Sequence, residues 1–94
     1  MATLTQPTEF VAWIDRSLDY SIEEWSEIPE IARKWSSWDE RDRLDFVLEW
    51  PLSEIRLREL QTWAAQGRLS ATQRKRFEEL ERLILRHRTT LDRL

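Results

Sequence analysis

The scarcity of glycine restricts this chain to a narrow range of folds: Gly67 is the only glycine in 94 residues. Domains built from β-strands need glycines in their turns and many β-branched residues, yet the only valines here are Val11 and Val47. Residues that favour helices, namely Leu, Arg, Glu, Ala and Gln, are frequent. The sequence therefore predicts an all-α fold.

The first third of the chain predicts three helical segments. A helix over residues 8–19 is predicted from apolar side chains at helical spacing, Phe10, Trp13, Ile14 and Leu18. Ser21 and Glu24 have the spacing of a capping box, which predicts a new helical start at Ser21. Because proline disfavours helix in the residue before it, we expect a break at residues 28–29 and then a short helix over residues 29–36.

The middle of the chain predicts two helices separated at Pro51. Ser37 and Glu40 repeat the capping-box spacing before a helix of about 38–49, whose apolar stripe consists of Trp38, Leu44, Val47 and Leu48, widened by Phe46 and Trp50. Pro51 is predicted to end this helix or to begin the next. Ser53 then caps a helix that carries Ile55, Leu57, Leu60, Trp63 and Ala64, and Gly67 suits a left-handed C-cap.

The last helix is predicted over residues of about 71–92, with a third capping-box spacing between Ser70 and Gln73. Its apolar side chains alternate three- and four-residue steps, the period of a coiled-coil seam: Phe77, Leu80, Ile84, His87, Leu91 and Leu94. At about 1.5 Å per residue this helix reaches some 30 Å, longer than a small globule needs. We therefore expect its end to project or to pair with another chain.

Taken together, these segments predict one domain over residues 1–94, folded as a compact bundle of four to five helices with a long C-terminal helix. The chain has no cysteine, so no disulfide stabilises it, and its six tryptophans are expected to supply much of the packing.

Residue usage argues against catalysis. With one histidine, His87, one glycine and no cysteine, the chain lacks the parts of a catalytic triad, a phosphate loop or a multi-histidine metal site. Asp42 and Asp45 are spaced to share a divalent ion, but acidic residues early in a helix also complement its dipole, and we predict no metal site and no cofactor. No apolar run would span a membrane and Met1–Thr5 does not resemble a signal peptide, so a cytoplasmic protein without a small-molecule substrate is expected.

Two surfaces are candidates for binding. The first comprises the tryptophans whose spacing least forces them inward and the residues of the C-terminal seam: Trp25, Trp38, Trp50, Leu80, Ile84, His87 and Leu91. The alternative is a basic cluster near Gly67 that suits nucleic acid, formed by Arg68, Arg74, Lys75 and Arg76. Against it, residues 73–76 are all polar where a DNA-recognition helix would bury apolar side chains.

Charge is distributed unevenly along the chain. Residues 1–50 contain twelve acidic and five basic residues, a net charge of −7, whereas residues 51–94 contain six acidic and ten basic residues, a net charge of +4. The two halves could pack beside each other within one chain or pair head to tail between chains.

Residues 44–94 resemble small helical bacterial antitoxin-like proteins. The residues concerned are Leu44 to Trp50, Pro51, Leu57, Leu60, the run Gly67–Ser70 and the row Phe77, Leu80, Leu83 and Ile84. The resemblance implies a partner toxin and assigns no functional residue. Our first hypothesis is a protein-interaction or self-association module, and the alternative is a nucleic-acid-binding or antitoxin-type regulator.

Overall fold

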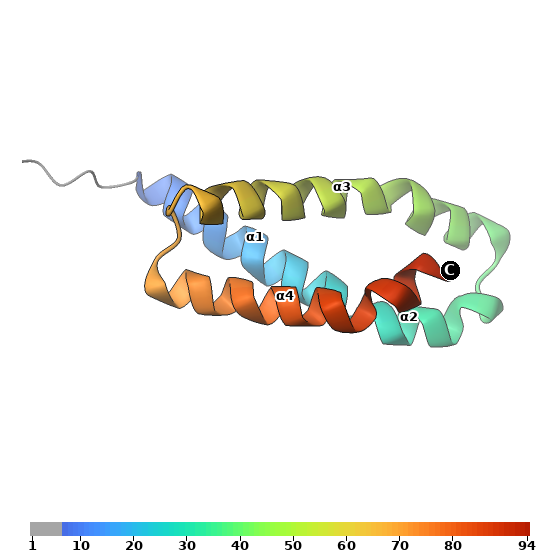
Figure 1. The fold of residues 1–94 in the computed structure, drawn as a ribbon. Coiled ribbons are helices and arrows are strands. Elements are labelled where there is room, and N and C mark those ends of the chain that lie inside the picture. Colours follow the sequence, from blue (N-terminus) through green and yellow to red (C-terminus); the bar gives the residue numbers. More distant parts are fainter. Residues whose placement is uncertain (1–6) are drawn as a thin grey trace, which may run out of the picture.

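The computed structural model describes residues 7–94 and contains no strand in that range (Figure 1). Its elements are helices α1 (Thr8–Ser26), α2 (Ile28–Lys34), α3 (Glu40–Ala65) and α4 (Ala71–Asp92), with one 3₁₀ turn, η1 (Trp35–Ser37). The prediction of an all-α fold is confirmed.

The helices form three long arms rather than a compact bundle of four or five, and Figure 1 shows their directions. The seven-residue α2 continues in the direction of α1, α3 runs back in the opposite direction, and α4 runs parallel to α1. The 26 residues of α3 give a rod of about 39 Å, longer than the roughly 30 Å diameter of a small domain. The predicted helix count and compactness are therefore corrected to an elongated three-arm fold.

The first arm is divided just before Pro29. Pro29 lies in the first turn of α2, where its missing N–H costs no helical hydrogen bond. The predicted helix start at Ser21 is wrong, because α1 continues to Ser26 and Ser21 is 1% exposed, with a hydroxyl that has no hydrogen-bond partner among the described residues. Ser21 lies on the same side of α1 as Ile14 and Trp25, so core packing decides its position.

Helix α3 differs from the sequence prediction at its start and at Pro51. Its N-cap is Asp39, whose carboxylate accepts a 2.8 Å hydrogen bond from the Asp42 N–H. Ser37 is not the cap, because its hydroxyl donates to the Lys34 carbonyl. Pro51 neither ends nor starts a helix: α3 passes through it. Proline has no N–H to donate to the carbonyl of Val47, four residues earlier. Since Pro51 is exposed, this carbonyl lies on the outer side of the helix, where water can solvate it.

The turn into α4 follows the sequence prediction closely. The Ser70 hydroxyl accepts from the Gln73 N–H at 3.1 Å, and the Gln73 side chain accepts from the Ser70 N–H at 2.9 Å, which completes the capping box. Gly67 has φ +70°, and the Arg68 N–H bonds back to the Trp63 carbonyl at 2.9 Å. The C-cap and the bounds of α4 are therefore confirmed.

Replacing Gly67 by alanine is expected to lower the free energy of unfolding by about 1 kcal/mol, because a Cβ is disfavoured at positive φ. No heavy atom outside the turn lies within 4 Å of the position of that Cβ, so backbone strain is the whole cost. Urea unfolding measures the change, and Gly67→Asn, which tolerates this backbone region better, is the control. Equal stability of wild type and Gly67→Ala would contradict the assignment.

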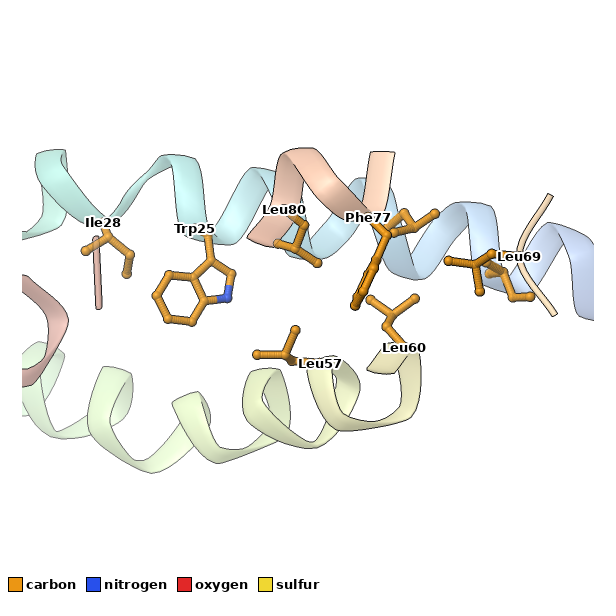
Figure 2. Packing of buried hydrophobic residues seen from close by; sticks show 9 residues of the cluster. Trp25, Ile28, Leu57, Leu60, Leu69, Phe77 and Leu80 are labelled. Carbon is orange, nitrogen blue, oxygen red and sulfur yellow. The ribbon is translucent and has the colours of Figure 1, made fainter. Parts of the chain in front are cut away.

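The core runs along the length of the arms rather than forming a central ball (Figure 2). Its buried side chains come from all three arms and from the turn before α4: Ile14, Leu18, Trp25, Ile28, Leu57, Leu60, Leu69, Phe77 and Leu80. α1 packs against both α3 and α4, and α2 packs against α4. α1 therefore lies between the other two long helices at the level of the core.

Candidate protein interface on helix α3

Helix α3 has apolar side chains on two opposite sides. One side faces α1 and contributes buried Leu57 and Leu60 to the core. The other side is here called the outer face and consists of Leu44, Val47, Leu48, Pro51, Leu52 and Ile55. Its five aliphatic side chains other than Pro51 are 51–65% exposed. Their steps of three and four residues place them in one continuous stripe over three turns.

An aromatic cluster fixes which side of α3 faces inward. Trp25 of α1 lies edge-on to Trp50 at 5.2 Å between ring centroids, and Phe46 stacks on Trp50 at 5.4 Å. Trp35 and Trp38 contact Phe46 at 5.6 and 6.2 Å. Such ring pairs add about 0.5–1.5 kcal/mol each beyond the area they bury. Phe46 and Trp50 therefore hold the N-terminal half of α3 with its outer face directed away from the core.

Two carboxylates join α3 to its neighbours. Glu24 of α1 accepts hydrogen bonds from the Ser53 hydroxyl and from Arg56, the latter at 2.7 Å. Glu54 accepts from Arg88 of α4 at 2.5 and 3.2 Å and from the Trp50 indole N–H at 2.8 Å. These contacts lie on the flanks of α3 and stop it from rotating about its axis, which would bury the outer face.

Acid is expected to weaken the contact between α3 and α4 through Glu54. Partial burial raises the pKa of Glu54, but hydrogen bonds from Arg88 and Trp50 lower it by more, so the pKa lies below its ordinary value of 4.5. A carboxylate whose folded-state pKa is lowered contributes its full stabilisation when the pH is above its unfolded-state pKa. This stabilisation is lost as the pH falls from the unfolded-state pKa through the folded-state pKa.

We therefore expect Glu54→Gln to be less stable than wild type by about 1 kcal/mol at pH 7 and by much less at pH 3. Urea unfolding of both proteins at the two pH values measures the difference. A difference in the free energy of unfolding that is the same at both pH values would show that the charge of Glu54 does not stabilise the contact.

A groove of about 490 Å³ adjoins the outer face. Val47, Pro51 and Ile55 form its α3 wall, and Leu91 and Leu94 form the wall from the end of α4. The apolar surface of α3 therefore continues sideways toward the C-terminus. Leu85, 83% exposed on α4, is not among the residues that line the groove.

The residues predicted from the sequence to bind a partner lie mostly elsewhere. Trp25 and Leu80 are 1% and 0% exposed, so neither side chain reaches the surface, and their assignment to a partner site is corrected. The others are partly buried: Trp38, Trp50, Ile84, His87 and Leu91. Trp38 and Trp50 belong to the aromatic cluster, and Leu91 lines the groove.

The C-terminal seam does not extend beyond its own fold. α1 and α2 pack along α4, and the end of α4 shares a pocket with the α2–η1 region, where Trp35 lies near Thr90 and Leu94. The prediction that this end projects is therefore wrong, and its alternative, pairing with another chain, stays a prediction. The sequence prediction also placed Leu44, Val47 and Leu48 on a core-facing stripe with Phe46 and Trp50, whereas the structure puts these two groups on opposite sides of α3.

The basic cluster lies at the start of α4, close to acidic residues of α1. Arg76 pairs with Asp19, and the Arg68 guanidinium lies 4.5 Å from the centroid of the Phe10 ring. Arg68, Arg74 and Lys75 are exposed. Part of the positive charge is therefore already engaged with α1.

Other kinds of site were sought over residues 7–94. No group of three His, Cys, Asp or Glu side chains there could hold a metal ion. None of the helices in the same range combines the length and apolar character needed to cross a membrane. Comparison with protein-family models, curated proteins and solved structures finds no match for the chain.

Proposed function

We propose that the protein is an interaction module that binds another polypeptide through the outer face of α3. The observation that supports this is the contiguous stripe of five aliphatic side chains, each at least half exposed, along one side of a helix whose other side packs against the core. Contiguous apolar patches rimmed by charges are typical of protein-binding surfaces. Amphipathic helices commonly supply the apolar partner for such a stripe.

The energetics require an apolar partner. Burying the exposed halves of five aliphatic side chains contributes roughly 1 kcal/mol each, or about 5 kcal/mol from this chain. Association costs about 4–15 kcal/mol in lost translational and rotational freedom. The partner must therefore contribute a comparable apolar surface of its own, which a polar peptide or a nucleic acid does not offer.

The nucleic-acid alternative has weaker support, because Arg76 and Arg68 already contact α1 side chains. The resemblance to antitoxin-like proteins suggests a toxin as one identity for the partner, but no contact in the chain favours a toxin over another protein.

A photo-reactive residue on the outer face tests the proposal. With p-benzoylphenylalanine at Leu48, we expect irradiation in the native cells to give a covalent adduct with a polypeptide, because Leu48 is 65% exposed at the centre of the stripe. Leu85, 83% exposed on α4, is the matched control position. Absence of any adduct at Leu48, or equal adducts at both positions, would contradict the proposal.

A further inference from the structure

Charged residues lie in a self-complementary order at the two ends of the outer face. Glu40 and Arg41 precede its first residue, and Arg58 and Glu59 follow its last. Arg41 and Glu59 are 18 residues apart, which is five whole turns at 3.6 residues per turn, so they lie on the same edge of the face. Glu40 and Arg58 are also 18 residues apart and lie together on the opposite edge.

A two-fold axis between residues 49 and 50 would use all four charges. Antiparallel pairing about that axis puts Arg41 of one copy opposite Glu59 of the other, and Glu40 opposite Arg58. The same axis brings Leu44 opposite Ile55 and Leu48 opposite Leu52. Each contact occurs twice, because a two-fold interface is made from the same patch on both subunits.

From this order we infer that the partner of the outer face is the outer face of a second copy, packed antiparallel; the inference rests on the function proposed above. A second copy supplies the comparable apolar surface that the energetics demand. Parallel in-register pairing would bring opposite edges together, with Arg41 against Glu40 and Arg58 against Glu59, so the exchange of charges tested below would weaken a parallel dimer instead of restoring it.

The structure leaves these charges available. Glu40, Arg41, Arg58 and Glu59 are exposed, and none of them forms an ion pair with another described residue, although the charge of Arg58 helps to lower the pKa of Glu54. α1 packs on the side of α3 that carries Leu57 and Leu60, and the five aliphatic side chains of the outer face are 51–65% exposed, so a second α3 can reach them; Leu91 and Leu94 flank the face only at the groove.

Charge reversal tests the antiparallel register. Arg41→Glu creates two like-charge contacts with Glu59 in the dimer, and Glu59→Arg creates two with Arg41, so each is expected to raise the dimer dissociation constant on the order of tenfold at low salt. The double variant Arg41→Glu/Glu59→Arg is expected to restore it. Within one chain these residues are about 27 Å apart along α3, beyond the reach of screened charges, so restoration must act between copies.

Sedimentation equilibrium of all four proteins measures these constants, with Arg86→Glu, an exposed change of the same charge on α4, as the control. A strictly monomeric wild type at millimolar concentration would overturn the inference. So would equal weakening by the control, or a double variant weaker than either single one.

Disulfide trapping provides a second, geometric test, which the absence of native cysteine makes clean. A mixture of Leu44→Cys and Ile55→Cys proteins is expected to form a mixed disulfide dimer. Either protein alone is expected to stay uncoupled. The cysteines of the two copies in its antiparallel dimer would be about 17 Å apart along the helix axis, well beyond disulfide range. Self-coupling of each variant would indicate parallel pairing and overturn the inference.

The photo-crosslinked adduct at Leu48 separates the two proposals. An adduct of twice the chain mass agrees with both. An adduct that contains only a different protein keeps the proposed function and overturns the second copy. Absence of any adduct removes both.

Discussion

Trp25→Ala is expected to destabilise the protein by about 3–5 kcal/mol, a large part of the 5–15 kcal/mol by which a domain is typically stable. Trp25 is 1% exposed, packs edge-on against Trp50, and has the Arg88 guanidinium 4.7 Å from its ring centroid. Truncation leaves a cavity where α1, α3 and α4 meet. It also removes the ring that orients Trp50.

Thermal and urea unfolding measure this loss. Trp13→Ala is the matched control, because Trp13 is 48% exposed on the same helix and should cost no more than about 1 kcal/mol. Similar losses in the two variants would mean that the aromatic cluster does not fix the position of α3.

The second large effect is expected for the double variant Leu48→Glu/Leu52→Glu. Its dimer dissociation constant is expected to rise by at least about 100-fold. The free energy of unfolding of its monomer is expected to change by less than about 1 kcal/mol. In the monomer both side chains are more than 60% exposed, so two carboxylates there stay hydrated. In the antiparallel pair the same four carboxylates would lie buried against each other without a partner, and burial of unpaired charge is prohibitive.

Sedimentation equilibrium reports the association, and circular dichroism with urea unfolding reports the fold. Leu85→Glu is the control, since it places the same charge at an exposed leucine of α4 outside the outer face. A double variant that still associates like wild type would exclude the outer face as the contact. One that unfolds would show that this side of α3 is part of the core.

Local signals in the sequence were sufficient to predict the structure where neighbouring residues satisfy the hydrogen-bonding groups of the backbone. Ser70 and Gln73 form their capping box from side chains three residues apart, and Gly67 alone can adopt its positive φ without strain. These interactions need no other helix. The start of α4 after Ser70 could therefore be predicted from the sequence.

Helix α3 could not be predicted in the same way, because a proline within a helical pattern normally marks a helix boundary, whereas α3 continues through Pro51. Dividing the segment at Pro51 hid the fact that Phe46 and Trp50 share a side with Leu57 and Leu60, while Leu44 and Leu48 share the opposite side with Leu52 and Ile55. Read as one helix, residues 40–65 show both stripes. That two-sided pattern is the signal by which the sequence could have indicated the outer face.

By itself, the sequence determined the helical class, the turn at Gly67 and the extent of the last helix, because capping and backbone conformation are local. The tertiary structure alone decided that Ser21 is buried, that α3 continues through Pro51, and that α1 and α2 pack along α4. It also decided which of the two apolar stripes of α3 stays outside. The physical reason is that both stripes are hydrophobic enough to be buried, and only the contacts of Trp25, Glu24 and Arg88 with α3 select one of them.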